Sequence, residues 1–317
     1  GIGAVLLITA FLLGYNLNNL GSVLGPVFTV LPCLLLLFIS DSKILIDTFN
    51  FIVNFFAVLL PISLLVFSLT FLGLPPVGEI THFSGLYGSF DNYLLAFRSG
   101  FYYYRFSSVF LEPGHLGMIL SYMLFALRFN FKDVRVIILF VASLFTFSLA
   151  AYVLIIVGYI FKLLLYRELR FRVVLLGSIS LCLLYLIAVN FNDGENLLNN
   201  HLFARLQPDG EKGFAGNNRT YGKLDDVYEV ATRHKDLVLW GIGVDNYNIL
   251  KENFDFGGAG IKVYVLRQGL VSVLLVFAAY LFMGLSLSKK KQYTLCFVLL
   301  LALSFWQRAY PFWASWL

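Results

Sequence analysis

The sequence predicts an all-α, polytopic membrane protein with about nine or more transmembrane helices and a large, partly helical external loop. Hydrophobic residues make up 59% of the 317 residues and charged residues 13%, and the mean hydropathy is +0.81. A water-facing surface cannot cover so apolar a chain of this size. The chain also contains several apolar runs near the length of about 20 residues that a helix needs to cross a bilayer core.

Nine apolar runs mark the predicted spans in chain order. They lie near residues 2–14, 22–40, 51–74, 109–127, 134–148, 150–166, 172–189, 262–286 and 292–310. The fifth and sixth runs are short and nearly continuous, and TFSLAAY between them fits either a tight helical hairpin or one long kinked helix. The predicted organisation is a membrane region over 1–189 with an external loop near 75–108, a large external loop over 190–261, and C-terminal membrane helices over 262–317.

Basic residues in the short connections set the predicted orientation. Connections 128–135, 162–172 and 289–291 are rich in Lys and Arg and fall on one side of the predicted spans. The positive-inside rule makes that side the cytoplasmic side of a cytoplasmic (inner) membrane. The large loop lies on the opposite, external side and carries eleven acidic against seven basic residues between 190 and 258. The net charge of +5 therefore reflects topology, and no nucleic-acid partner is expected.

Ionisable residues gather where the fourth predicted span begins. The segment RFSSVFLEPGHLG, residues 105–117, carries Arg105, Glu112 and His115. Pro113 suits the first turn of a helix, so Glu112 neighbours the N-cap and His115 lies in the first turn. Glu112 and His115 are therefore candidates for a catalytic base. The competing interpretation is that Glu112 only caps the helix and His115 hydrogen-bonds a neighbouring loop.

Arginines on the external side, where the positive-inside rule does not ask for them, form a second set of candidates. Guanidinium groups bind phosphate oxygens in a bidentate fork, so converging arginines can form a diphosphate site without a metal ion. Arg219 and Arg267 are the strongest candidates; Arg267 lies inside a predicted span, where a charge is costly unless it faces a polar cavity or the interface. Arg98 and Arg105 are further candidates. Arg205 is interpreted as solvated.

The large external loop is predicted to be folded. Apolar residues recur at helical spacing across 222–235, which predicts an amphipathic helix. The chain then turns at Gly241-Ile242-Gly243. A glycine pair of this kind either lets backbone N–H groups approach a ligand or forms a plain turn, and the plain turn is favoured.

These motifs resemble those of the O-antigen polymerase and ligase superfamily, a group of membrane glycosyltransferases that act on polyprenyl-diphosphate-linked saccharides. FLEPGHLG is similar to an acidic-proline motif before a central span, and FTFSLAAYVLIIV to a threonine-serine break between two short helices. NNRTYGKLDDVYEVATRHKDLVLWGIGVDNY resembles the arginine, helix and GxG pattern of the large external loop, and GGAGIKVYVLRQGLVSVLLV the helix that follows. The resemblance covers about residues 98–285.

The resemblance implies a GT-C-like fold and a metal-independent, inverting polymerase. The implied reaction moves a growing glycan from undecaprenyl diphosphate onto a lipid-linked repeat unit of O-antigen, capsule or exopolysaccharide. Glu112, His115 and Arg219 are then expected to be catalytic, and Arg98, Arg105, Arg219 and Arg267 to hold the diphosphate. The expected partners are the undecaprenyl-diphosphate-linked oligosaccharide, membrane lipid and a chain-length regulator protein, and no cofactor is expected.

Two alternatives stay open. An O-antigen ligase is expected to carry a histidine about ten residues before the glycine of the helix after the large loop. Ahead of Gly269 the sequence reads FGGAGIKVY, and His82, His201 and His234 do not map onto that position, which favours the polymerase. A transporter or flippase of lipid-linked saccharides is expected to show internal repeats and midplane polar groups, whereas the ionisable residues here concentrate on one face.

Overall fold

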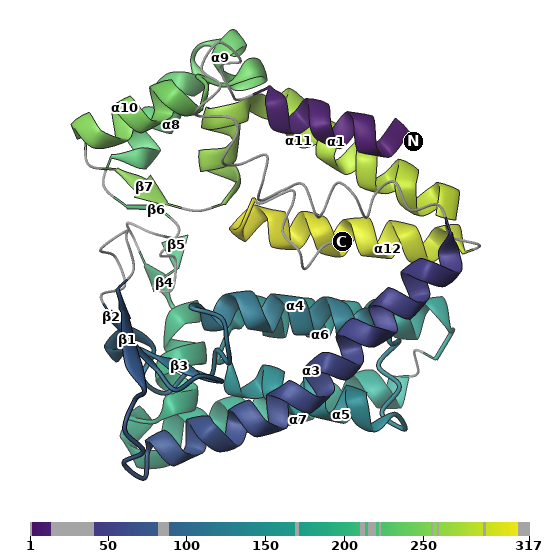
Figure 1. The fold of residues 1–317 in the computed structure, drawn as a ribbon, viewed down its shortest axis with the longest axis vertical. Coiled ribbons are helices and arrows are strands. Elements are labelled where there is room, and N and C mark those ends of the chain that lie inside the picture. The colour runs from purple at the N-terminus through teal and green to yellow at the C-terminus, as the bar shows by residue number, and fades with distance from the viewer. Residues whose placement is uncertain are drawn as a thin grey trace. The chain divides into compact units, whose positions relative to one another are not determined.

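The structure is a computed structural model that describes residues 2–13, 41–81, 89–168, 171–209, 213–214, 220–221, 223–254, 256–258, 260–287 and 290–309. It is mostly helical (Figure 1). The chain divides into two compact units. The central unit consists of residues 46–216, and the terminal unit of residues 1–45 and 217–317.

Helices occupy every predicted span that the structure describes; the run at 22–40 lies outside the described residues. These helices are α1 (Ile2–Leu12), α3 (Ser42–Thr70), α4 (Pro113–Ala126), α5 (Val134–Phe145), α6 (Leu149–Leu165), α7 (Phe171–Asn190), α11 (Ile261–Leu287) and α12 (Lys291–Gln307). Apolar patterning therefore located the helices correctly.

The predicted number of nine or more spans is not supported. Among the described residues, two helices are long and apolar enough to cross a membrane, over Lys43–Thr70 and Ile261–Ser286. With 12 and 14 residues, α5 and α4 measure about 18 and 21 Å, short of a bilayer core of about 30 Å. Part of the overcount comes from α4, α5 and α6, which turns limit to 14, 12 and 17 residues. The structure is compatible with a helical membrane protein that has two candidate membrane-spanning helices.

In the central unit, α4 is the core helix. Every residue from Pro113 to Phe125 except His115 is buried. Gly117 of α4 lies against Ala151 of α6, and Gly158 of α6 lies against Phe125 of α4, so α6 runs parallel to α4. A helix enclosed in this way is apolar because it is covered by protein.

Helix α5 returns to the end of the central unit where α4 begins. The amide of Phe106, ahead of α4, donates to the carbonyl of Phe145 at the end of α5 over 2.9 Å. The chain then reverses at residues 146–148 and α6 runs back alongside α4. Of the two interpretations of TFSLAAY, the structure shows a reversal of direction and not one long kinked helix.

The predicted external loop near 75–108 contains a small antiparallel sheet. Its strands are β1 (Gly78–Thr81), β2 (Ser89–Asn92) and β3 (Phe97–Arg98), in the order β1-β2-β3, followed by the 3-10 helix η1 (Gly100–Tyr102). The hydroxyl of Ser63 in α3 donates to the hydroxyl of Ser108 over 2.9 Å. This buried contact ties the segment after the sheet to the middle of α3.

The central unit ends in short helical turns and one strand pair. These are η2 (Phe191–Gly194), the π-helical turn η3 (Asn199–Phe203), η4 (Ala204–Leu206), and strands β4 (Pro208–Asp209) and β5 (Gly213–Phe214), which pair antiparallel. The ring of Phe203 meets that of Tyr185 in α7 at 5.2 Å. This contact holds the turns against the end of α7.

In the terminal unit, α1 and α12 pack on α11. The hydroxyl of Ser272 in α11 donates to the carbonyl of Ala10 in α1 over 2.7 Å, and Tyr264 of α11 meets Phe305 of α12 edge to face at 5.1 Å. The remaining elements are α8 (Leu224–Thr232), α9 (Lys235–Trp240), α10 (Val244–Phe254), and strands β6 (Thr220–Tyr221) and β7 (Gly257–Gly258), which pair antiparallel.

The helix predicted near 222–235 is confirmed as α8. Its apolar residues Leu224 and Ala231 are buried in a core shared with Tyr247, Phe256 and Leu266. The amphipathic pattern of α8 therefore reflects packing against α10 and the start of α11.

Candidate active site

The acidic-proline turn forms a carboxylate–imidazole pair. Glu112 is the N-cap residue of α4, with φ −121° and ψ 128°, and Pro113 opens the helix. The Glu112 side chain makes no capping hydrogen bond; its Oε2 lies 3.6 Å from Nε2 of His115. Both side chains are partly exposed, 14% for Glu112 and 23% for His115. The pair therefore offers the two groups of an acid–base dyad.

Arg105 is fixed to the break between α5 and α6. Its Nε donates to the carbonyl of Thr146 over 3.1 Å, and its guanidinium lies 5.1 Å from the ring centroid of Tyr102. A Cβ on Gly117 would lie 3.0 Å from the hydroxyl of Thr146, so the first part of α4 touches the same break. Arg105 and the first part of α4 therefore both contact the break at residues 146–148.

His201 and Arg205 join this neighbourhood from the end of the central unit. The ring of His201 lies 5.8 Å from that of Phe147, the residue after Thr146. Burial, and then the positive charges of Arg105 and Arg205, hold the pKa of His201 below its ordinary value. Burial also lowers the pKa of Arg205. Arg105 from one segment and Arg205 from another thus both act electrostatically on His201.

Sequence reasoning did not find the His201–Arg205 part of this group. Arg205 was interpreted as solvated, but it is only partly exposed and lies close enough to Tyr102 for the two side chains to affect each other's charge. A signal was present in the sequence: His201 and Arg205 are four residues apart in a segment that forms consecutive helical turns. Side chains at that spacing share a face of a helix.

Arg98 lies inside the central unit. Its guanidinium sits 3.6 Å from the ring centroid of Tyr103 and 4.3 Å from that of Phe71, and Nη1 donates to the carbonyl and hydroxyl of Thr70 at 3.2 and 3.0 Å. The residue is 7% exposed. A phosphate could reach this guanidinium only if the two rings moved, so the geometry gives Arg98 a structural contact between the end of α3 and the turn after β3.

Arg267 belongs to the terminal unit, and Arg219 lies outside the described residues. Helix α11 is interrupted two residues after Arg267, at Gly269, which has φ 79° and ψ 166°. The guanidinium of Arg267 lies 5.8 Å from the ring centroid of Tyr247. Its Nε is buried without a hydrogen-bond partner in the described part of the chain. A buried donor in this state is the kind of group that an anion or water satisfies.

The Gly241-Ile242-Gly243 turn is structural. The amides of Ile242 and Gly243 donate to the carbonyls of Leu266 and Arg267 at 2.7 and 3.1 Å. These N–H groups fill the hydrogen-bond positions that the interruption of α11 leaves open. The plain-turn interpretation, which the sequence favoured, therefore holds.

Neither a metal-binding cluster among the described residues nor a known similar protein adds a chemical group to this neighbourhood. Within the described residues, no three His, Cys, Asp or Glu side chains gather where they could hold a metal ion. No protein-family model matches the chain, and no curated protein or solved structure matches it either. The candidate site therefore rests on its own geometry.

Proposed function

We propose that the protein is a membrane glycosyltransferase that polymerises lipid-linked oligosaccharide repeat units. Two observations carry this proposal: a carboxylate–imidazole pair in the first turn of α4, and a basic cluster at the α5–α6 break, which Gly117 of α4 contacts. Transfer of a glycan from a diphosphate needs both parts: a base for the acceptor hydroxyl and cations for the leaving group. The proposed donor and acceptor are undecaprenyl-diphosphate-linked oligosaccharides.

The Glu112–His115 pair serves the acceptor in this proposal. As the acceptor oxygen bonds to the anomeric carbon, its proton passes to one member of the pair, and the 3.6 Å separation lets the other member stabilise the charge that results. The bond from the anomeric carbon to the diphosphate oxygen breaks, and its electron pair stays on that oxygen. A single in-line displacement inverts the anomeric configuration.

Arg105 and Arg205 serve the leaving diphosphate. Arg105 is held by the carbonyl of Thr146, so its fork is oriented before substrate binds, and partial burial strengthens its attraction for phosphate charge. Arg219 and Arg267 are proposed as further diphosphate ligands, with Arg219 catalytic as well. Arg98 contributes least, because the rings of Phe71 and Tyr103 enclose it.

The proposal also covers the membrane location of the protein and the side of the membrane on which the site lies. The candidate spans of α3 and α11 support a membrane location, and a polyprenyl chain dissolves in a membrane. We assign the membrane to the cytoplasmic (inner) membrane and the site to its external side, with a chain-length regulator protein as partner. The polymer formed is O-antigen, capsule or exopolysaccharide.

The test uses the purified full chain with a synthetic undecaprenyl-diphosphate repeat unit and no metal, read as a ladder on a gel. We expect wild type to extend the chain, and Glu112→Gln and Arg105→Ala each to slow extension by about 100-fold or more. Arg233→Ala is the matched control, because Arg233 is exposed, pairs with Glu229 and belongs to the terminal unit.

Full activity of both site variants would contradict the assignment of this site. If wild type forms no ladder but moves the undecaprenyl-diphosphate repeat unit between the leaflets of a vesicle, the transporter interpretation is favoured.

A further inference from the structure

Two parallel helices of the central unit end in the same unusual way. Arg128 follows the C-cap Leu127 of α4 with φ 57°, and Arg167 follows the C-cap Tyr166 of α6 with φ 54°. This is the left-handed region, which glycine or asparagine normally occupies at a helix end, because a Cβ crowds the backbone there. Strained residues of this kind persist where the surrounding structure holds them in place, and they cluster at functional sites.

The two arginine turns lie side by side at one end of the central unit. Phe129, next to Arg128, is 3% exposed and meets the ring of Tyr159 in α6 at 5.5 Å. The guanidinium of Arg128 lies 5.9 Å from the ring centroid of Tyr166, the residue before Arg167. Contacts between α4 and α6 therefore bring both arginines to one rim.

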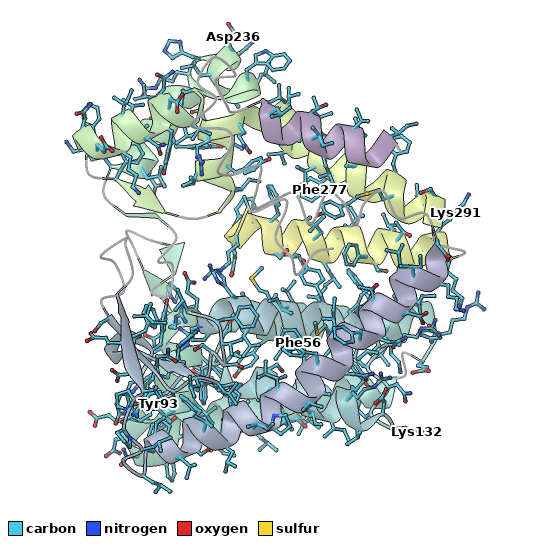
Figure 2. The ribbon with its side chains drawn as sticks, viewed as in Figure 1. Phe56, Tyr93, Lys132, Asp236, Phe277 and Lys291 are labelled. Carbon is cyan, nitrogen blue, oxygen red and sulfur yellow. The ribbon has the colours of Figure 1, made fainter. Side chains whose placement is uncertain are left out.

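The rim carries an excess of positive charge. Arg135 pairs with Asp133 at 2.7 Å, and Lys162 pairs with Glu168, so the acidic residues of the two turns are already neutralised. Arg128, Lys132 and Arg167 are exposed, and no carboxylate of the described residues lies within ion-pair distance of these three. We name these three residues the basic rim. Lys132 lies at the opposite end of the central unit from Tyr93 (Figure 2).

An apolar stripe begins beside the basic rim. Along α5, four aliphatic residues on one side of the helix are exposed: Val134, Ile137, Val141 and Leu144. Arg135, at the rim end of α5, donates to the side chain of Asn54 in α3, which is one of the two candidate membrane helices. The surface thus places cations next to apolar side chains, and Asn54 links it to α3 within the candidate span Lys43–Thr70.

We propose that the basic rim binds the headgroup of an anionic phospholipid, with the acyl chains along the exposed stripe of α5. A phosphodiester carries a negative charge that can pair with Arg128, Lys132 and Arg167, for which no carboxylate partner is found among the described residues. Arginine binds a phosphate group through its planar fork. An amphiphile also covers the adjoining apolar stripe, which a free phosphate does not. Basic clusters at a membrane surface attract anionic lipids in this way. The site is separate from the proposed glycosyl transfer and does not depend on it.

The test measures the Tm of the full chain in detergent micelles with added phosphatidylglycerol or phosphatidylcholine. We expect phosphatidylglycerol to raise the Tm of wild type by about 4 °C more than phosphatidylcholine does. The double variant Arg128→Asn/Arg167→Asn should lose at least about half of that difference, because it removes both guanidinium groups. Asparagine tolerates the left-handed region, so this variant keeps the helix ends.

Three further variants test whether the lipid effect depends on the charges of the basic rim. Arg128→Lys/Arg167→Lys keeps the charge and should keep most of the phosphatidylglycerol effect. Leu94→Asn changes another left-handed residue of the central unit, with φ 69°, without changing charge. Lys251→Gln removes an exposed charge from α10 in the terminal unit. Both controls should respond to phosphatidylglycerol as wild type does.

Two outcomes would overturn the proposal. One is a wild type whose Tm rises no more with phosphatidylglycerol than with phosphatidylcholine, or an asparagine double variant that keeps the full phosphatidylglycerol effect. The other is an equal rise in Tm with inorganic phosphate at matched ionic strength, which would mean that the rim binds a soluble anion and no lipid.

Discussion

The two units each contain a broken helical segment, and the breaks are closed in different ways. In the terminal unit, α11 is interrupted at Gly269, and backbone from the Gly241-Ile242-Gly243 turn closes the gap by donating to the carbonyls of Leu266 and Arg267. A Cβ on Gly241 would lie 2.7 Å from the amide nitrogen of Gly269. Two backbones thus touch with no side chain between them.

In the central unit, side chains close the break between α5 and α6. The hydroxyl of Thr146 donates to the carbonyl of Ser143 at 2.7 Å and accepts from the amide of Ser148 at 3.3 Å. The carbonyl of Thr146 then accepts from Arg105. Each break has an arginine beside it, but the partner differs: Arg105 donates to the carbonyl of Thr146, whereas Nε of Arg267 has no hydrogen-bond partner in the described part of the chain. The α5–α6 break therefore holds its arginine in a fixed orientation, and the break in α11 does not do so through Nε.

The largest expected effect tests the backbone contact in the terminal unit. In Gly269→Ala, the new Cβ would overlap the carbonyl oxygen of Leu239, and φ 79° is strained for any residue with a Cβ. We expect the free energy of unfolding to fall by about 3–5 kcal/mol, measured by thermal or denaturant unfolding.

Two glycine controls separate crowding from backbone strain. Gly73→Ala has φ 91° but open space around its Cβ, so it should lose only the strain, about 1–2 kcal/mol. Gly177→Ala lies in α7 with nothing near its Cβ, and should gain about 0.5–1 kcal/mol. A Gly269→Ala variant no less stable than Gly73→Ala would contradict the close contact.

A smaller effect is expected at the break in the central unit. In Gly117→Ala, the Cβ would lie 2.7 Å from that of Ala151 and 3.0 Å from the hydroxyl of Thr146. This contact is less close than the one at Gly269, and Gly117 has no positive φ, so we expect a smaller loss of about 1–3 kcal/mol in the free energy of unfolding. If the proposed function holds, glycan extension should fall as well, because Thr146 positions Arg105.

The control for this variant is Gly158→Ala on α6. Its nearest neighbour, Phe129, lies 3.4 Å from the new Cβ, an ordinary contact. Stability should stay the same or rise by up to about 1 kcal/mol from helix propensity. Equal stability of the Gly117 and Gly158 variants would show that α4 and α6 do not approach closely at the break.

The smallest expected effect is electrostatic and concerns His201. Its pKa is lowered in the folded protein, by burial first and by Arg105 and Arg205 next. The unfolded chain therefore binds more protons than the folded one as the pH falls below about 6.5. The contribution of His201 to stability is complete above that pH and is lost as the pH falls through the lowered pKa.

The measurement is the change in Tm between pH 7 and pH 5. We expect wild type to lose about 1–2 °C more over this range than His201→Gln, which cannot titrate. The pKa of Asp133 is also lowered, but this carboxylate is present in both proteins and titrates at lower pH. Identical pH profiles would mean that neither burial nor the two arginines lower the pKa of His201 in the folded protein.

The sequence was enough to predict the helices but not their roles. The helix over Leu149–Leu165 and the turn before it were readable from the apolar run and the Thr146-Phe147-Ser148 break. The number of membrane spans was not, because α4 is as apolar as a membrane span while protein, not lipid, covers it. Hydropathy indicates that a residue is removed from water, but it does not distinguish burial in protein from burial in lipid.

The candidate site also has a part that the sequence predicts and a part that only the tertiary structure shows. The acid, proline and histidine of residues 112–115 are neighbours in the chain, so the sequence by itself determined that Glu112 and His115 meet at the first turn of α4. Only the tertiary structure decided that Arg105 binds Thr146, that His201 lies on Phe147, and that Gly241 touches Gly269. Local pairs follow from helical geometry, whereas these contacts join residues brought together by the packing of separate helices and turns, which no local pattern encodes.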